Sequence, residues 1–185
     1  MHFSNAIDAN IVRKALNEVE SLCTAADCGL SYMALVAKFG DDLAQAGTRN
    51  DFWFHTRGAL LGSFVINWCK LFGVDVKNQY WKQTTLEQKA FRECVYQKTG
   101  FNYQSWDKYR KAMGDLKAVM SDHMNPYYPI EQLPDLNPAI DIINVCYQWL
   151  KEVVEYLGLE MPAQLANDNY LEKVEADIQQ TLDKF

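Results

Sequence analysis

The sequence has few of the features that mark a disulfide-rich, zinc-binding or disordered protein. Its five cysteines are an odd number, are widely scattered and include no Cys-x2-Cys pair, which argues against a disulfide framework and against a zinc site. Proline and glycine are scarce, with five and nine residues, and charged residues make up only 23% of the chain against 49% hydrophobic residues. This composition argues against disorder, and the length suits one domain, which we expect to span 1–185.

Long apolar runs and a surplus of positive charge are also missing. No run reaches the roughly 18 to 20 apolar residues of a membrane span. The segment Met1–Asn5 lacks the basic start and apolar block of a secretory signal. We therefore expect a cytoplasmic protein without membrane association. The net charge of −6 argues against broad non-specific binding of nucleic acid, although it leaves room for one local basic site.

Apolar residues recur at spacings of three and four, and no Asn-Gly or Asp-Gly hairpin turn occurs, so the sequence predicts an all-α protein. Glycine, proline and capping residues divide the chain into expected helices. These cover about 8–26, 30–46, 51–72, 85–99, 105–123, 137–157 and 169–184, with a break at Cys28–Gly29 and a loop over 73–83. The expected architecture is an antiparallel bundle of four or five core helices with an additional C-terminal helix.

Two of these helices have unusual apolar faces. The face of the helix over 137–157 covers more than half of its circumference, so this helix is either the centre of the bundle or shared with a second subunit. In the helix over 51–72, Arg57 falls near the centre of the apolar side. Because an unpaired buried charge is costly, a buried ion pair is the favoured explanation for Arg57, and a role in a functional cleft is the alternative.

The segment Lys117–His123 is the most informative stretch of the chain. It ends an expected helix with a basic residue six positions before a histidine, on neighbouring flanks of the last turns, where both could reach one phosphodiester. Metal-free RNA cleavage needs a proton acceptor for the ribose 2′-hydroxyl and a cation for the charge that builds on the phosphate. Histidine suits the first task, and lysine supplies positive charge without the two-pronged geometry of arginine.

This segment also resembles the Arg-x4–6-His signature of the HEPN family, all-helical proteins that include metal-independent ribonucleases. Further resemblance to HEPN proteins of the abortive-infection type extends over about 53–157, which leaves 159–185 as a C-terminal extension. It is carried by Val65-Ile66-Asn67-Trp68-Cys69-Lys70-Leu71-Phe72-Gly73, by Tyr80-Trp81-Lys82, by Trp106-x2-Tyr109-Arg110 and by Ile130-x3-Pro134-Asp135-Leu136-x2-Ala139. The order and spacing of these runs are similar to the second core helix, the motif helix and the loop into the final core helix of the family.

The resemblance implies a role for each motif position. His123 takes the place of the family histidine as the acid/base, and Lys117 takes the place of the family arginine as the phosphate-binding cation. Ala118 replaces the polar residue that usually follows this arginine. In active members the histidine and arginine work in a cleft between two subunits, so the resemblance also implies a homodimer.

Three further residues are candidates for binding substrate. Arg110 lies seven residues before Lys117 on the same helical flank and could supply a guanidinium. Trp81 and Tyr80, in the expected loop, are candidates for stacking on a base, and covering the end of the bundle is the structural alternative. The structural alternative for His123 is a packed, hydrogen-bonded histidine, since it falls inside the apolar stripe of its helix, and for Lys117 it is a solvated charge at the helix edge.

These features favour a HEPN-like protein of a toxin–antitoxin or phage-defence type with a weak metal-independent endoribonuclease site. RNA and a cognate antitoxin are then the expected partners besides a second copy. No cofactor or metal is expected, since no Glu-x2-His pair of a di-iron bundle occurs. The alternative is a catalytically inactive HEPN-like dimer that binds RNA, a nucleotide or a protein partner, which the lysine at position 117 favours over an efficient nuclease. A helical bundle with a role in assembly alone is a third interpretation, which the retained histidine spacing disfavours.

Overall fold

The computed structural model of the chain describes residues 9–44, 51–74, 81–82, 87–123, 133–166 and 169–184, and within these ranges it is all-α without a strand. The predicted fold class is therefore confirmed. The helices in chain order are α1 (Ala9–Leu16), α2 (Val19–Ala44), α3 (Asp51–Phe72), α5 (Gln88–Thr99), α6 (Tyr103–His123), α7 (Asn137–Tyr156) and α8 (Tyr170–Leu182).

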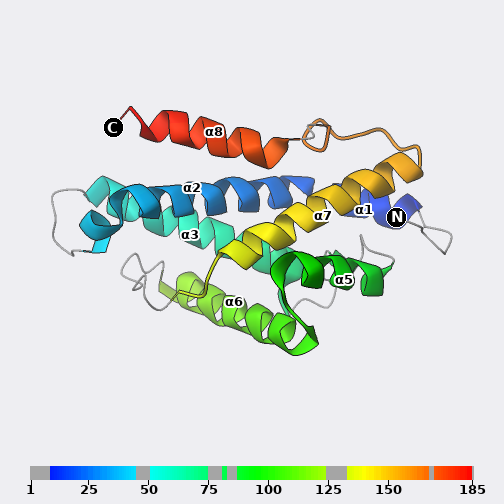
Figure 1. The fold of residues 1–185 in the computed structure, drawn as a ribbon, viewed down its shortest axis with the longest axis horizontal. Helices are drawn as coiled ribbons and strands as arrows, with labels where there is room; N and C mark the ends of the chain where they lie inside the picture. Colours follow the sequence, from blue (N-terminus) through cyan, green and yellow to red (C-terminus); the bar gives the residue numbers. More distant parts are fainter. Residues whose placement is uncertain are drawn as a thin grey trace.

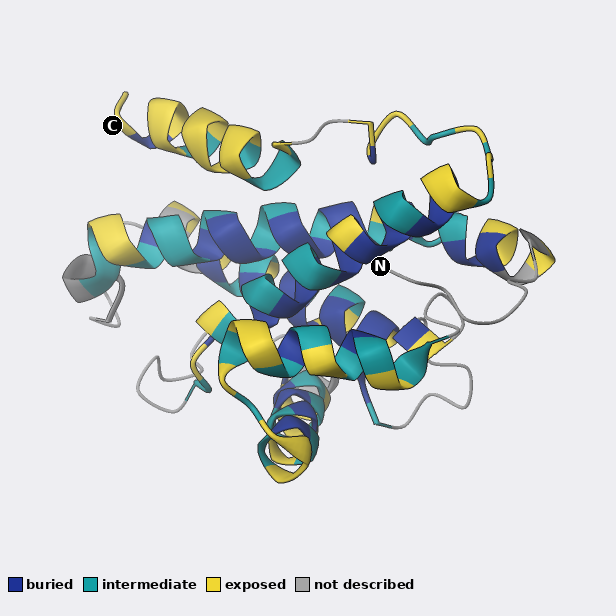
Figure 2. Cartoon of the chain, turned by 45° about the vertical axis from the view of Figure 1, so that its right-hand side comes forward, coloured by how far each residue is buried: buried dark blue, intermediate teal, exposed yellow. Residues whose placement is uncertain are grey.

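The long helices α2 and α3 run side by side in opposite directions and form the middle of the molecule (Figure 1). Helix α6 packs on α3, α7 crosses α2 and packs on α5, and α8 lies along α2 on the side away from α6 (Figure 1). One buried cluster draws side chains from α1, α2, α3, α5, α6 and α7. Helix α8 stands apart from this core: Leu182 is its one buried residue, and most of its surface is exposed (Figure 2).

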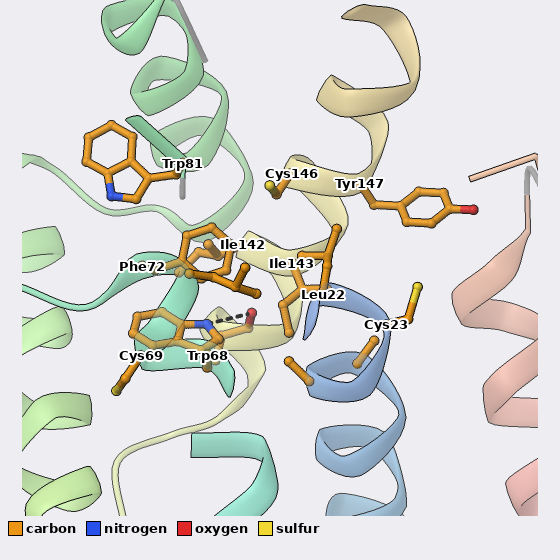
Figure 3. Packing of buried hydrophobic residues seen from close by; sticks show 14 of the residues in the cluster. Leu22, Cys23, Trp68, Cys69, Phe72, Trp81, Ile142, Ile143, Cys146 and Tyr147 are labelled. Atoms are coloured by element: carbon orange, nitrogen blue, oxygen red, sulfur yellow. Dashed lines mark hydrogen bonds between the residues drawn. The ribbon is translucent and has the colours of Figure 1, made fainter. Parts of the chain in front are cut away.

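Helix α7 buries its wide apolar face within the chain. It packs on α5 and on α2, and Trp68 of α3 donates its indole N–H to the carbonyl of Ala139 at 3.3 Å (Figure 3). The buried residues of α7 are Ala139, Ile142, Ile143, Cys146, Tyr147, Trp149, Leu150, Val153 and Val154. The apolar face is thus covered within the chain, and its width is no longer an argument for a second subunit.

The predicted helix break at Cys28–Gly29 is wrong. Helix α2 continues through both residues, and the chain turns instead at 17–18, between α1 and α2. Gly29 lies where α2 passes close to α3 and α7, because a Cβ atom added to it would lie 2.8 Å from Phe64 Cδ2 and 2.8 Å from Ile140 Cδ1. The glycine therefore permits close packing of three helices and does not end one of them.

The remaining helix boundaries follow local capping. The predicted helix over 51–72 is confirmed, and α5 ends as predicted at Gly100, whose left-handed φ of 72° lets its N–H reach the carbonyl of Tyr96. Helix α6 begins at Tyr103, two residues earlier than predicted, because the Asn102 carboxamide accepts the Ser105 N–H at 3.0 Å. The predicted start at Thr85 lies outside the described residues.

One helical stretch, Val12–Gly40, is long and apolar enough by length and composition to cross a membrane. Of its most apolar window, 44% is buried inside the protein. The core helix of a soluble bundle passes the same test, so this finding is weak evidence for a membrane span. The absence of membrane association stays a prediction from the sequence.

The close packing at Gly29 gives a testable prediction. The Gly29→Ala substitution should lower the free energy of unfolding by about 1–2 kcal/mol, because the added methyl group must displace the buried Phe64 ring. The matched control is Gly40→Ala in the same helix, where the nearest atom to the new Cβ is Val36 Cγ1 at 3.9 Å. This control should be neutral or up to about 1 kcal/mol more stable, since alanine favours the helix. Urea unfolding measures both variants, and equal effects would contradict the assignment of Gly29 to helix packing.

Candidate functional site

Helix α6 presents one buried stripe to the bundle and carries the candidate motif at its C-terminal end. The buried residues follow one another at intervals of three and four, as expected for one face of a helix. They are Trp106, Arg110, Met113, Leu116 and Met120. An arginine within an otherwise apolar stripe indicates that the fold itself uses this guanidinium.

The motif positions lie on either side of the buried stripe. Helix α6 continues without interruption through positions 117 and 123, and Lys117 is half-buried. Six residues correspond to about 9 Å along an α-helix and to a net rotation of about 120°. The helix backbone therefore places Lys117 and position 123 on opposite flanks of Leu116 and Met120. The side chain of His123 and all of Tyr80 lie outside the described residues.

Arg110 is bound to the end of α3. Its side chain is 7% exposed, its Nε donates to the carbonyl of Phe72 at 2.6 Å, and its Nη2 donates to the carbonyl of Gly73 at 2.7 Å. Carbonyls at the end of a helix have no partner within the helix, so these two bonds cap α3 from the neighbouring helix. Because Arg110 is buried and two of its five N–H groups make this cap, its guanidinium is not open to a phosphate in this conformation.

Two tryptophans enclose the guanidinium from other sides. The Arg110 Cζ atom lies 5.8 Å from the ring centroid of Trp81 and 5.6 Å from that of Trp106, within range of cation–π attraction. Trp81 is helical, not in the predicted loop, and its ring stacks on Phe91 at 5.8 Å between centroids. With 1% of Trp81 exposed, neither face of its indole is open to a base in this conformation.

The electrostatics of α6 follow from this burial. Burial lowers the pKa of the Arg110 guanidinium, and the carboxylate of Asp107 partly opposes that effect. Asp107 also pairs with Lys111 at 2.9 Å on the exposed side of the helix. The Tyr109 hydroxyl donates to the carbonyl of Asp135 at 2.7 Å. Burial raises the pKa of Tyr109, and the negative charge of Asp135 raises it further. Arg110 and Tyr109 thus fix α6 to α3 and to the segment before α7.

Arg57 is buried in α3, with 5% of its surface exposed, as its position in the apolar stripe predicts. It lies close enough to Tyr32 of α2 to act on the phenol: burial raises the pKa of Tyr32 to about 12, and the positive charge of Arg57 works in the opposite direction. These observations place Arg57 between α2 and α3. The ion pair proposed for Arg57 stays a prediction.

Within the described ranges, no group of three or more His, Cys, Asp or Glu side chains is placed to hold a metal ion. Hollows of about 450 and 580 Å³ flank α8, on the side of α2 away from α6. Their lining residues come from helices far apart in the sequence, so no local pattern marks them.

Comparison of the chain with protein-family models, with curated proteins and with solved structures finds no match. The assignment of a function therefore depends on the residues and geometry of the chain itself.

The structural role of Arg110 predicts the effect of replacing it. Arg110→Lys should lower the free energy of unfolding by about 2 kcal/mol, because an ammonium group cannot hold the Phe72 and Gly73 carbonyls in the planar geometry of a guanidinium. The reciprocal variant Lys117→Arg, on the same helix, should change stability by less than about 0.5 kcal/mol. Denaturant unfolding provides the measurement, and an Arg110→Lys variant as stable as the native protein would contradict the proposed cap.

Proposed function

We propose that this chain is a catalytically weakened HEPN-like protein of a toxin–antitoxin or phage-defence type. In this proposal it forms a homodimer and binds RNA at the C-terminal end of α6 without cutting it efficiently. The observation that carries the proposal is the position of Arg110, whose guanidinium is bonded to the carbonyls of Phe72 and Gly73. The guanidinium nearest to the motif along α6 is thereby used by the fold.

Lys117 is then the cation that the proposal assigns to phosphate. A lysine attracts a phosphate as a point charge, whereas an arginine binds two of its oxygens at once. Ground-state attraction of RNA therefore remains, and stabilisation of the charge that develops during cleavage is reduced. Loss of one well-placed donor to such a charge typically lowers the rate by about 10²–10³-fold.

A weak metal-independent endoribonuclease is the second candidate. The uninterrupted course of α6 through positions 117 and 123 supports it, because the spacing of the motif is kept on one rigid helix. In this alternative, Lys117 binds the phosphate and His123 transfers the proton. The two candidates differ in whether the native chain turns over RNA at a measurable rate.

One set of variants separates the candidates. Cleavage of total RNA in EDTA should be undetectable for the native chain, should appear in Lys117→Arg, and should disappear again when His123→Ala is added to Lys117→Arg. The gain is expected because arginine restores the two-oxygen contact at an otherwise unchanged position. Fluorescence anisotropy with single-stranded RNA should show that the native chain binds and that binding weakens as salt rises.

Other results would change the assignment. Cleavage by the native chain that is abolished by His123→Ala would establish the second candidate. A folded Lys117→Arg variant that neither binds nor cleaves RNA would contradict the HEPN-like proposal in both forms.

A further inference from the structure

A groove runs between α8 and the pair formed by α2 and α3, on the side of the bundle away from α6 (Figure 1). It has a volume of about 450 Å³, within the range of sites that hold small molecules. Its lining residues come from all three helices. They are Asp27, Ser31, Leu35, Thr56, Leu60, Val174, Asp177, Ile178, Thr181 and Leu182.

Helix α8 is fixed at its two ends and leaves the groove open between them. At its start, the hydroxyl of Tyr170 donates to Asp27 Oδ1 at 2.7 Å, and the Tyr170 ring stacks on Tyr147 at 5.6 Å between centroids. At its end, Lys38 Nζ donates to the carbonyl of Leu182. Between these anchors the apolar side chains of α8 are only partly buried. Contacts at both ends of α8 therefore hold this helix in place beside the groove.

The lining combines an apolar middle with negative charge. Five aliphatic side chains form most of its wall, and three hydroxyl groups lie among them. Its charged groups are Asp27 and Asp177, and no lysine, arginine or histidine lines it among the residues that the structure describes. Asp27 is half-buried and Asp177 is exposed, so both carboxylates remain accessible to the cationic ends of a ligand whose apolar part lies on the aliphatic wall.

The spacing of the two carboxylates selects the shape of a ligand. Helix α8 runs parallel to α2, since Tyr170 meets Asp27 and Leu182 meets Lys38. Asp177 lies seven residues after Tyr170, so its backbone stands about 10 Å further along the axis of α8 than that of Tyr170, whose hydroxyl meets Asp27. A straight aliphatic chain with ammonium groups at its ends would lay its methylenes on the apolar middle and place one cation near each carboxylate.

We propose that this groove binds a linear aliphatic diammonium or polyammonium ligand. The ligand bridges α2 and α8, so its binding ties the C-terminal helix to the bundle. This site is separate from the motif on α6, and neither the RNA-binding proposal nor its failure bears on it.

Three probes of equal chain length test the class of ligand by calorimetry on the full chain at physiological salt. These are 1,8-diaminooctane, octylamine and 1,8-octanediol, with two, one and no positive charges. We expect the affinity to fall in that order, with the diammonium at least about tenfold tighter than the diol because each end meets a carboxylate. Equal affinity of diol and diammonium, or no binding of the diammonium, would overturn the proposal.

A pair of charge-matched variants tests the site. Asp177→Asn should weaken binding of 1,8-diaminooctane about threefold, the range of an exposed ion pair. Asp183→Asn removes the same charge from the end of the same segment, outside the groove lining, and should leave the affinity unchanged. Equal weakening by both variants would show general attraction to an acidic surface and would contradict a defined site. Circular dichroism checks that both variants keep their helices.

Discussion

The packing of α6 on α3 depends on the hydrogen bonds from the buried guanidinium of Arg110 to the carbonyls of Phe72 and Gly73. This guanidinium joins the last carbonyls of α3 to the middle of α6 across 38 residues of sequence, and it holds Trp81 and Trp106 against the same point. A charged group is buried at low cost only when its hydrogen bonds are satisfied, and here two carbonyls and two aromatic faces take the place of water. Together with the buried apolar residues of α6, this contact holds α6 against α3.

This contact also gives Arg110, the arginine of the helix that carries the motif, a structural role. Because the Arg110 guanidinium is buried and bonded to two carbonyls, the proposed function assigns the phosphate to Lys117, a cation without the planar donor geometry of a guanidinium. Lys117 is half-buried on α6, and this helix continues without interruption through position 123. On the other side of the bundle, the groove under α8 is lined by aliphatic side chains and by the carboxylates of Asp27 and Asp177.

The sequence predicts the elements of this fold better than their contacts. Periodicity and capping residues locate α3 and α7 to within a residue, because those signals are local. Gly29 led to a wrong prediction of a helix break, because the atoms that require a glycine there belong to Phe64 and Ile140 on other helices. The hydrogen-bond partners of Arg110 are main-chain carbonyls, which every residue has, so the sequence does not indicate which residues Arg110 contacts. Asp27 and Asp177, 150 residues apart in the sequence, line the same groove, and no pattern in the chain predicts this.

The most direct test of this account is the solvent exchange of the Arg110 Nε–H group, measured by nuclear magnetic resonance with and without single-stranded RNA. The exposed Arg13 serves as the internal reference. The account predicts that the Arg110 signal exchanges far more slowly than that of Arg13, because its Nε–H is buried and bonded to Phe72, and that added RNA leaves it unchanged. Exchange as fast as that of Arg13, or a shift of the Arg110 signal on binding RNA, would contradict it.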